Sequence, residues 1–229
     1  MIEDGTRVLD DLARSSRFGS LEALLAAHTL FLHPDVVKQT RGRAVVPVVR
    51  DFARRGTAGQ LPDGRRVVFC DNSTPRDLFL WSSGSKTARD VQYNHVWPGT
   101  NTDPDAYTAL WNLCVTPAFL ARLTDRGALM ALVQYRAFTL FGDVLPMKWR
   151  PNEKPEGYDS LEEWWLGPAG AVKDLEAALR SRMARRPRSR ASLAASHICW
   201  LFHPDGPDET LGLGWVGTPS STRGAVRDA

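Results

Sequence analysis

The chain has 229 residues, of which 43% are hydrophobic and 24% are charged, with a formal net charge of +3 at pH 7. A chain of this length and composition can bury a full core without disulfide bonds or a structural metal. No apolar run approaches the roughly 20 residues that span a bilayer. The first five residues are acidic and lack the apolar segment of a signal peptide, so we expect a cytoplasmic protein with no membrane partner.

The cysteines indicate reduced thiols. The three cysteines, Cys70, Cys114 and Cys199, are far apart in sequence, and each follows an apolar residue. No pair has the close spacing of a structural zinc site. We therefore expect free, buried thiols in a reducing compartment.

The elements in chain order predict an α+β fold that is predominantly helical. Apolar spacing near the N-terminus predicts helices over residues 6–31, broken at 17–19, with Ser20 as the second N-cap. Further helices are expected at 45–54, 128–141, 171–184 and 189–202. Strands are expected at 66–70, 78–81, 91–97 and 113–116, followed by a helix from Pro117 to about Asp125.

This order divides the chain into four parts. Residues 1–64 form an N-terminal helical region and residues 65–126 a mixed α/β centre. Residues 127–205 form a C-terminal helical region, and the Gly-, Ser- and Pro-containing residues 206–229 form a flexible tail. We expect the function to lie in the centre.

One segment of that centre places a histidine near a strand end. His95 follows Asn94, and a polar loop separates it from Asn112-Leu113, which opens the next strand 17 residues further along. A short helix follows that strand. This strand–strand–helix order resembles the ββα-metal nucleases, the group that includes the HNH endonucleases.

The resemblance implies a metal-dependent nuclease that hydrolyses phosphodiester bonds of DNA or RNA. It implies that His95 is the general base and that Asn112 either ligates a divalent metal or organises the loop. A neutral imidazole is a competent base at neutral pH. Mg²⁺ is the expected metal, because it prefers oxygen ligands and tolerates several waters.

The helix after the second strand departs from the family pattern. HNH enzymes carry a further His or Asn there, whereas residues 117–124 contain neither. The nearest candidate ligand is Asp125 at the helix end, and Asp71 is a second candidate if its strand packs alongside. The turn chemistry of residues 71–75 equally fits a simple Asx turn.

Arginines are gathered in two short stretches, a pattern compatible with phosphate contacts but also with solvated surfaces. The stretch from which we predict nucleic-acid contacts contains Arg180, Arg182, Arg185, Arg186, Arg188 and Arg190. The other contains Arg41, Arg43, Arg50, Arg54 and Arg55.

Two alternatives stay open. The chain could bind nucleic acid or protein on a ββα-like scaffold without cutting, with His95 as a core histidine bonded to a carbonyl and Asn112 as a turn cap. It could also be a hydrolase in which His95 activates Cys114, because Asn112 and Cys114 are expected on one face of their strand.

Overall fold

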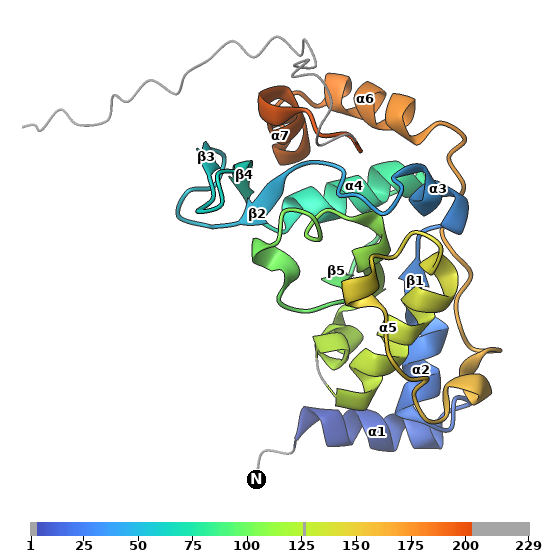
Figure 1. Cartoon of the computed structure of the whole chain (residues 1–229). Helices are drawn as coiled ribbons and strands as arrows, with labels where there is room; N and C mark the ends of the chain where they lie inside the picture. Colours follow the sequence, from blue (N-terminus) through green and yellow to red (C-terminus); the bar gives the residue numbers. More distant parts are fainter. Residues whose placement is uncertain (1–3, 126, 203–229) are drawn as a thin grey trace, which may run out of the picture.

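The computed structural model describes residues 4–125 and 127–202. The fold is α+β, with two small sheets among helices (Figure 1). The α-helices are α1 (Gly5–Ser15), α2 (Leu21–His28), α3 (Pro34–Gln39), α4 (Ser73–Ser83), α5 (Gly127–Phe141), α6 (Leu175–Arg185) and α7 (Arg190–Ile198). The 3₁₀ helices are η1 (Thr100–Thr102), η2 (Leu110–Asn112), η3 (Ala118–Asp125), η4 (Met147–Trp149) and η5 (Tyr158–Leu161).

The first sheet has the strand order β1-β6-β5 and is antiparallel throughout. Its strands are β1 (Leu30–Phe31), β5 (Val91–His95) and β6 (Leu113–Pro117). β5 and β6, the two strands expected around the polar loop, pair antiparallel, with Tyr93 opposite Val115 and His95 opposite Leu113. β5 is an edge strand, so residues at its end are free to line a cavity.

The second sheet has the order β2-β4-β3, with β2 parallel and β3 antiparallel to β4. Its strands are β2 (Val48–Arg50), β3 (Ala58–Gln60) and β4 (Arg66–Cys70). A helix was expected at 45–54, and that prediction is wrong. The run Val45-Val46-Pro47-Val48-Val49 is β-branched and interrupted by proline, and it pairs with β4 instead.

The strand expected at 78–81 is also wrong, because these residues belong to α4. Pro75 stands in the first turn of α4, and Gly84 follows its last residue with φ of +68°. Proline near the start and a left-handed glycine just past the end are the ordinary boundaries of a helix. The apolar run Leu78–Trp81 is buried on the helix rather than on a sheet.

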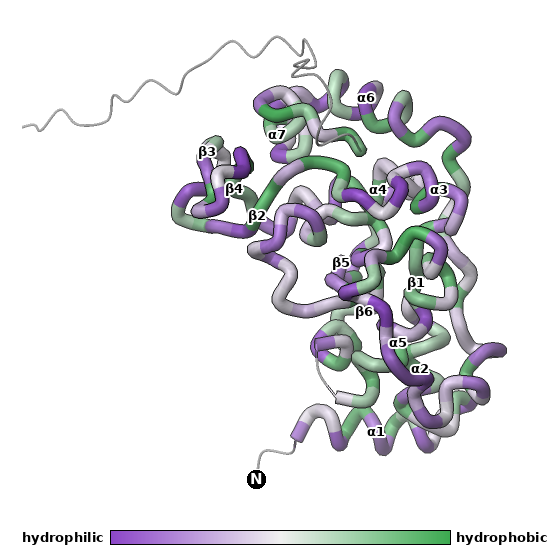
Figure 2. Tube along the Cα trace, viewed as in Figure 1, coloured by the Kyte–Doolittle hydropathy of each residue, from purple (hydrophilic) through white to green (hydrophobic). Residues whose placement is uncertain are grey.

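The N-terminal prediction is confirmed for the break and the cap: α1 and α2 flank residues 17–19, and the Ser20 side chain accepts a hydrogen bond from the Ala23 amide as the N-cap. It is wrong at the far end, because α2 ends at His28 and Leu30–Phe31 pairs with β6 as β1. One hydrophobic core cluster draws residues from Ala13 to Phe202. The hydrophobic strand β1 pairs with β6, and α2 contacts both β6 and α5 (Figure 2). The expected flexible tail lies outside the described residues. No helix among those described is long and apolar enough to cross a bilayer.

The segment after β6 is a 3₁₀ helix, and its pitch decides which side chains are buried. Leu120 and Leu123 are buried, whereas Phe119 is 58% exposed. Three residues per turn place positions 120 and 123 on one side and turn position 119 outward. Asp125 ends this helix beside the sheet edge.

Candidate active site

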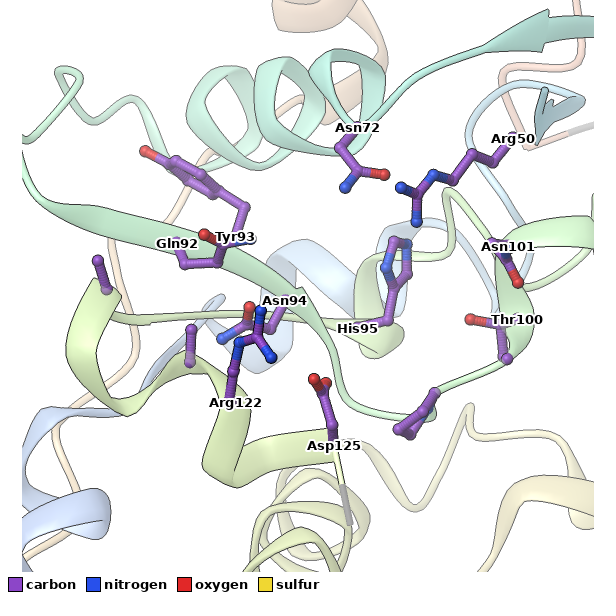
Figure 3. Close-up of a pocket in the computed structure, with 14 residues that line it drawn as sticks. Arg50, Asn72, Gln92, Tyr93, Asn94, His95, Thr100, Asn101, Arg122 and Asp125 are labelled. Atoms are coloured by element: carbon purple, nitrogen blue, oxygen red, sulfur yellow. The ribbon is translucent and has the colours of Figure 1, made fainter. Parts of the chain in front are cut away.

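His95 lines a cavity of about 650 Å³ at the end of β5. The cavity walls come from β2, the start of α4, β5, the loop after it and η3 (Figure 3). Its charged and amide-bearing residues are Arg50, Asn72, Gln92, Asn94, His95, Asn101, Arg122 and Asp125. The expected base and one expected metal ligand, Asp125, therefore share one cavity.

The His95 ring is held by a single neighbour. Its Nε2 lies 3.0 Å from the carbonyl oxygen of Tyr107, and the two rings stack with centroids 4.9 Å apart. Because a carbonyl only accepts, Nε2 carries the proton and Nδ1 presents a lone pair. Nδ1 has no hydrogen-bond partner among the described residues. His95 therefore makes the hydrogen bond to a carbonyl that is expected of a core histidine, and its Nδ1 can still accept a proton.

Burial sets the protonation state of this imidazole. Desolvation lowers the pKa of His95 from 6.5 to about 4, with a smaller opposing effect of the Tyr107 carbonyl, and nearby Arg50 lowers it further. The imidazole is therefore neutral at pH 7 and can accept a proton.

Asn112 is completely buried and holds the loop between β5 and β6. Its amide oxygen accepts a hydrogen bond from the Trp97 amide at 2.9 Å. Its amide nitrogen donates to the Thr100 hydroxyl and to the Ala106 carbonyl, each at 2.9 Å. Of the two roles left open for Asn112, the geometry matches the loop organiser. The expected role of Asn112 as a metal ligand is corrected here, because its amide oxygen is buried and already accepts the hydrogen bond from the Trp97 amide.

Asp71 does not join His95. One carboxylate oxygen of Asp71 accepts from the Ser73 amide at 2.9 Å, and the other pairs with Arg55 at 3.0 Å. This is the Asx-type turn considered from the sequence. Asp71 is absent from the lining of the His95 cavity. Within residues 4–125 and 127–202, no group of three or more His, Cys, Asp or Glu side chains could hold a metal ion.

Asn94 is better placed than Asn112 or Asp71 to supply an oxygen ligand, although the sequence motif alone did not predict this role. Its amide nitrogen donates to the Thr116 hydroxyl at 2.8 Å. Its amide oxygen accepts no hydrogen bond from the described residues, and Asn94 lines the cavity with Asp125. Figure 3 shows Asn94 and Asp125 with Arg122 beside them.

Two arginines supply positive charge to the cavity. Arg50 points toward the His95 ring from β2, and Arg122 comes from η3 (Figure 3). Neither forms an ion pair with another described residue. Arg50 belongs to the second arginine stretch described above, whereas Arg122 is not among the residues predicted from the sequence. An unpaired guanidinium in a cavity is suited to oxygen anions such as phosphate.

The six arginines expected to bind nucleic acid lie elsewhere, on and after α6 and at the start of α7. Arg180 pairs with Glu176 at 2.7 Å, and Arg185 donates to the Ser181 hydroxyl. None of the six lines the His95 cavity. Contact with nucleic acid by this stretch stays a prediction, and it would lie outside the His95 cavity.

Cys114 is poorly placed as a nucleophile. It is fully buried and lies opposite Asn94 in the β5–β6 pair, while His95 lies opposite Leu113. Burial raises the pKa of the Cys114 thiol to about 12, so the thiol stays protonated at neutral pH. Cys70 and Cys114 are free and buried, whereas Cys199, which was also expected to be buried, is partly exposed.

Comparison with known proteins adds no further guide. No family model matches the chain, and searches of curated proteins and of solved structures find no significant match.

Proposed function

We propose that this chain is an HNH-like phosphodiesterase that hydrolyses nucleic acid in the His95 cavity. The observation that carries the proposal is the neutral imidazole of His95, fixed through Nε2 and free at Nδ1, in a cavity with two unpaired arginines. The strand–strand–helix order around it supports the resemblance noted from the sequence.

In the proposed reaction, Nδ1 of His95 takes a proton from a water molecule. The resulting hydroxide forms a bond to phosphorus as the bond from phosphorus to the leaving oxygen breaks, and the leaving oxygen takes a proton from a water molecule in the open cavity. Arg50 and Arg122 bind the non-bridging phosphate oxygens and stabilise the added negative charge. The Tyr107 carbonyl keeps the proton on Nε2, so the base presents the correct nitrogen.

We further propose that the cavity binds one hard cation such as Mg²⁺. The free amide oxygen of Asn94 and the carboxylate of Asp125 would hold it, with waters completing its shell. When bound, such an ion neutralises negative charge on the phosphate and on the leaving oxygen. Arg122 lies beside both ligands and contributes positive charge from the protein itself (Figure 3).

A chelation experiment tests this function. Labelled single-stranded and duplex DNA and RNA are incubated with the parent protein, with Mg²⁺ or with EDTA. We expect cleavage that requires Mg²⁺ and that disappears in the His95→Gln variant. His28→Gln is the control, because His28 lies on α2 against Phe18 and away from the cavity. Cleavage that survives in His95→Gln would rule out the proposed base.

A non-cutting binding protein is the second candidate. It is favoured by the single carboxylate, Asp125, among the cavity residues and by the absence of His and Asn in residues 118–125. This candidate predicts that the parent protein binds nucleic acid with or without Mg²⁺ and leaves it intact.

A further inference from the structure

A second cavity of about 400 Å³ adjoins the first. The two share three lining residues, Asn72, Gln92 and Tyr93, so they form one continuous depression along β5. The second cavity is completed by Phe52, Asp71, Ser73, Arg76 and Val91.

The charges around this second cavity are paired within the protein. Asp71 binds Arg55 at 3.0 Å, and Arg76 binds the buried carboxylate of Asp77 at 3.0 Å. In the first cavity, in contrast, the guanidinium groups of Arg50 and Arg122 form no ion pair with another described residue. The depression therefore has a cationic part and a part without net charge.

Two aromatic side chains line the neutral part. The side chain of Phe52 is 59% exposed, which is unusual for so large an apolar group. The Arg50 guanidinium lies 4.6 Å from the Phe52 ring centroid and so connects this ring with the cationic cavity. Tyr93 is fixed by an edge-on contact with Phe79, at a centroid distance of 5.7 Å.

We propose that the second cavity binds a nucleobase of a single-stranded nucleic acid, with the base stacked on Phe52. The inference rests on the proposed function, which places a phosphodiester in the neighbouring cavity. A nucleotide joins a neutral aromatic base to an anionic phosphate. The depression matches this arrangement, because its neutral, aromatic part suits the base and its cationic part suits the phosphate. Asn72 and Gln92 add amide groups that can bond base edges.

The single-stranded form follows from the stacking itself. In a duplex both faces of each base are covered by neighbouring bases, so no face is open to an aromatic side chain. A base that stacks on Phe52 must come from a single strand or must leave the helix.

The test compares strands with and without bases. Kd values are measured by fluorescence anisotropy in EDTA for labelled oligothymidine, oligouridine and the corresponding abasic strands, using the His95→Gln variant as background. We expect the abasic strands to bind roughly fivefold to a hundredfold more weakly. Phe52→Ala should remove that ratio, and Phe52→Trp should keep it. The DNA and RNA arms show which sugar is preferred.

Phe119→Ala is the matched control, because Phe119 is equally exposed but lines neither cavity. It should keep the parent ratio. The proposal is overturned if base removal has no effect on the binding of the background variant, if that variant binds no strand, or if Phe52→Ala keeps the ratio. Cleavage is scored separately, so a stacking subsite without cleavage would contradict only the proposed reaction, and cleavage without base-dependent binding would contradict only this subsite.

Discussion

His95 and Tyr107 are joined twice, by stacked rings inclined at 16° and by the hydrogen bond from Nε2 to the Tyr107 carbonyl. Tyr107 is itself fixed, because its amide donates to the Asp103 carbonyl and its hydroxyl donates to the Asn72 side chain at 3.1 Å. The orientation of the proposed base is thus set by a loop residue and, through it, by the start of α4.

Replacing the base should affect the rate and leave binding intact. We expect His95→Gln to lower the single-turnover cleavage rate by about a hundredfold to ten-thousandfold, the usual contribution of a general base. The Kd for a single strand, measured in EDTA, should stay within about threefold, because the proposed phosphate contacts come from Arg50 and Arg122 rather than from His95. Tyr107→Phe keeps the ring and the carbonyl, so it should cost far less than His95→Gln. Equal losses in both variants would point to a general disruption of the cavity.

The pH dependence of cleavage should reflect a buried histidine. With the pKa of His95 lowered to about 4, the acidic limb of kcat/KM should lie near pH 4, well below the value of about 6.5 for an exposed imidazole. An acidic limb near pH 6.5 would mean that the titrating base is a solvated group.

The same group makes the free energy of unfolding depend on pH. Between pH 6.5 and 4 the unfolded chain binds a proton at His95 that the folded chain rejects, so stability falls as the pH is lowered through this window. The loss from this group is roughly 3 kcal/mol at most. Urea unfolding at several pH values should show a shallower fall for His95→Gln than for the parent. Parallel curves would contradict the lowered pKa.

Removing the Asn112 side chain should destabilise the fold. Asn112→Ala deletes three hydrogen bonds and leaves the Trp97 amide buried without a partner among the described residues. We expect a loss of about 2–4 kcal/mol in the free energy of unfolding. Asn101→Ala, on the same loop and with no side-chain hydrogen bond among the described residues, should change stability by less than about 0.5 kcal/mol. If both variants melt alike, Asn112 does not organise the loop.

The two arginine groups can be separated by salt titration. Arg50→Ala and Arg122→Ala should each weaken binding to a single strand and lower the slope of log K against log salt by about 0.7, the value for one lost phosphate contact. Arg182→Ala, on the exposed face of α6, is the comparison. If Arg182→Ala weakens binding more than Arg50→Ala or Arg122→Ala does, the nucleic acid binds instead at the arginine stretch predicted from the sequence.

Local patterns predicted part of the fold. The β5–β6 pairing follows from two alternating segments joined by a polar loop, and the start of α2 follows from Ser20. The run Leu78–Trp81 was misassigned because a short apolar segment fits a buried strand and a buried helix equally well. The α6 prediction was displaced, since α6 begins at Leu175 after its N-cap Asp174 rather than near 171. β2 was missed because its partner strand lies about twenty residues away.

The candidate site was predicted only where it is local in sequence. His95 and Asn112 belong to one loop, so their spacing carried information about their roles. Arg50 and Asn72 reach the cavity from another sheet and from the start of α4, and no spacing rule connects them with His95. Arg122 could have been noticed, since it lies one 3₁₀ turn before Asp125 and so on the same side of η3.

The buried amide of Asn112 has a consequence for the entropy of substrate binding. It ties Trp97, Thr100 and Ala106 together, so the irregular segment between β5 and β6 is already ordered before any ligand arrives. If a single-stranded nucleic acid binds in the cavity, the entropic cost of ordering this segment is therefore small. The Trp97 amide, although outside any regular element, should exchange its hydrogen with solvent as slowly as the core strands do.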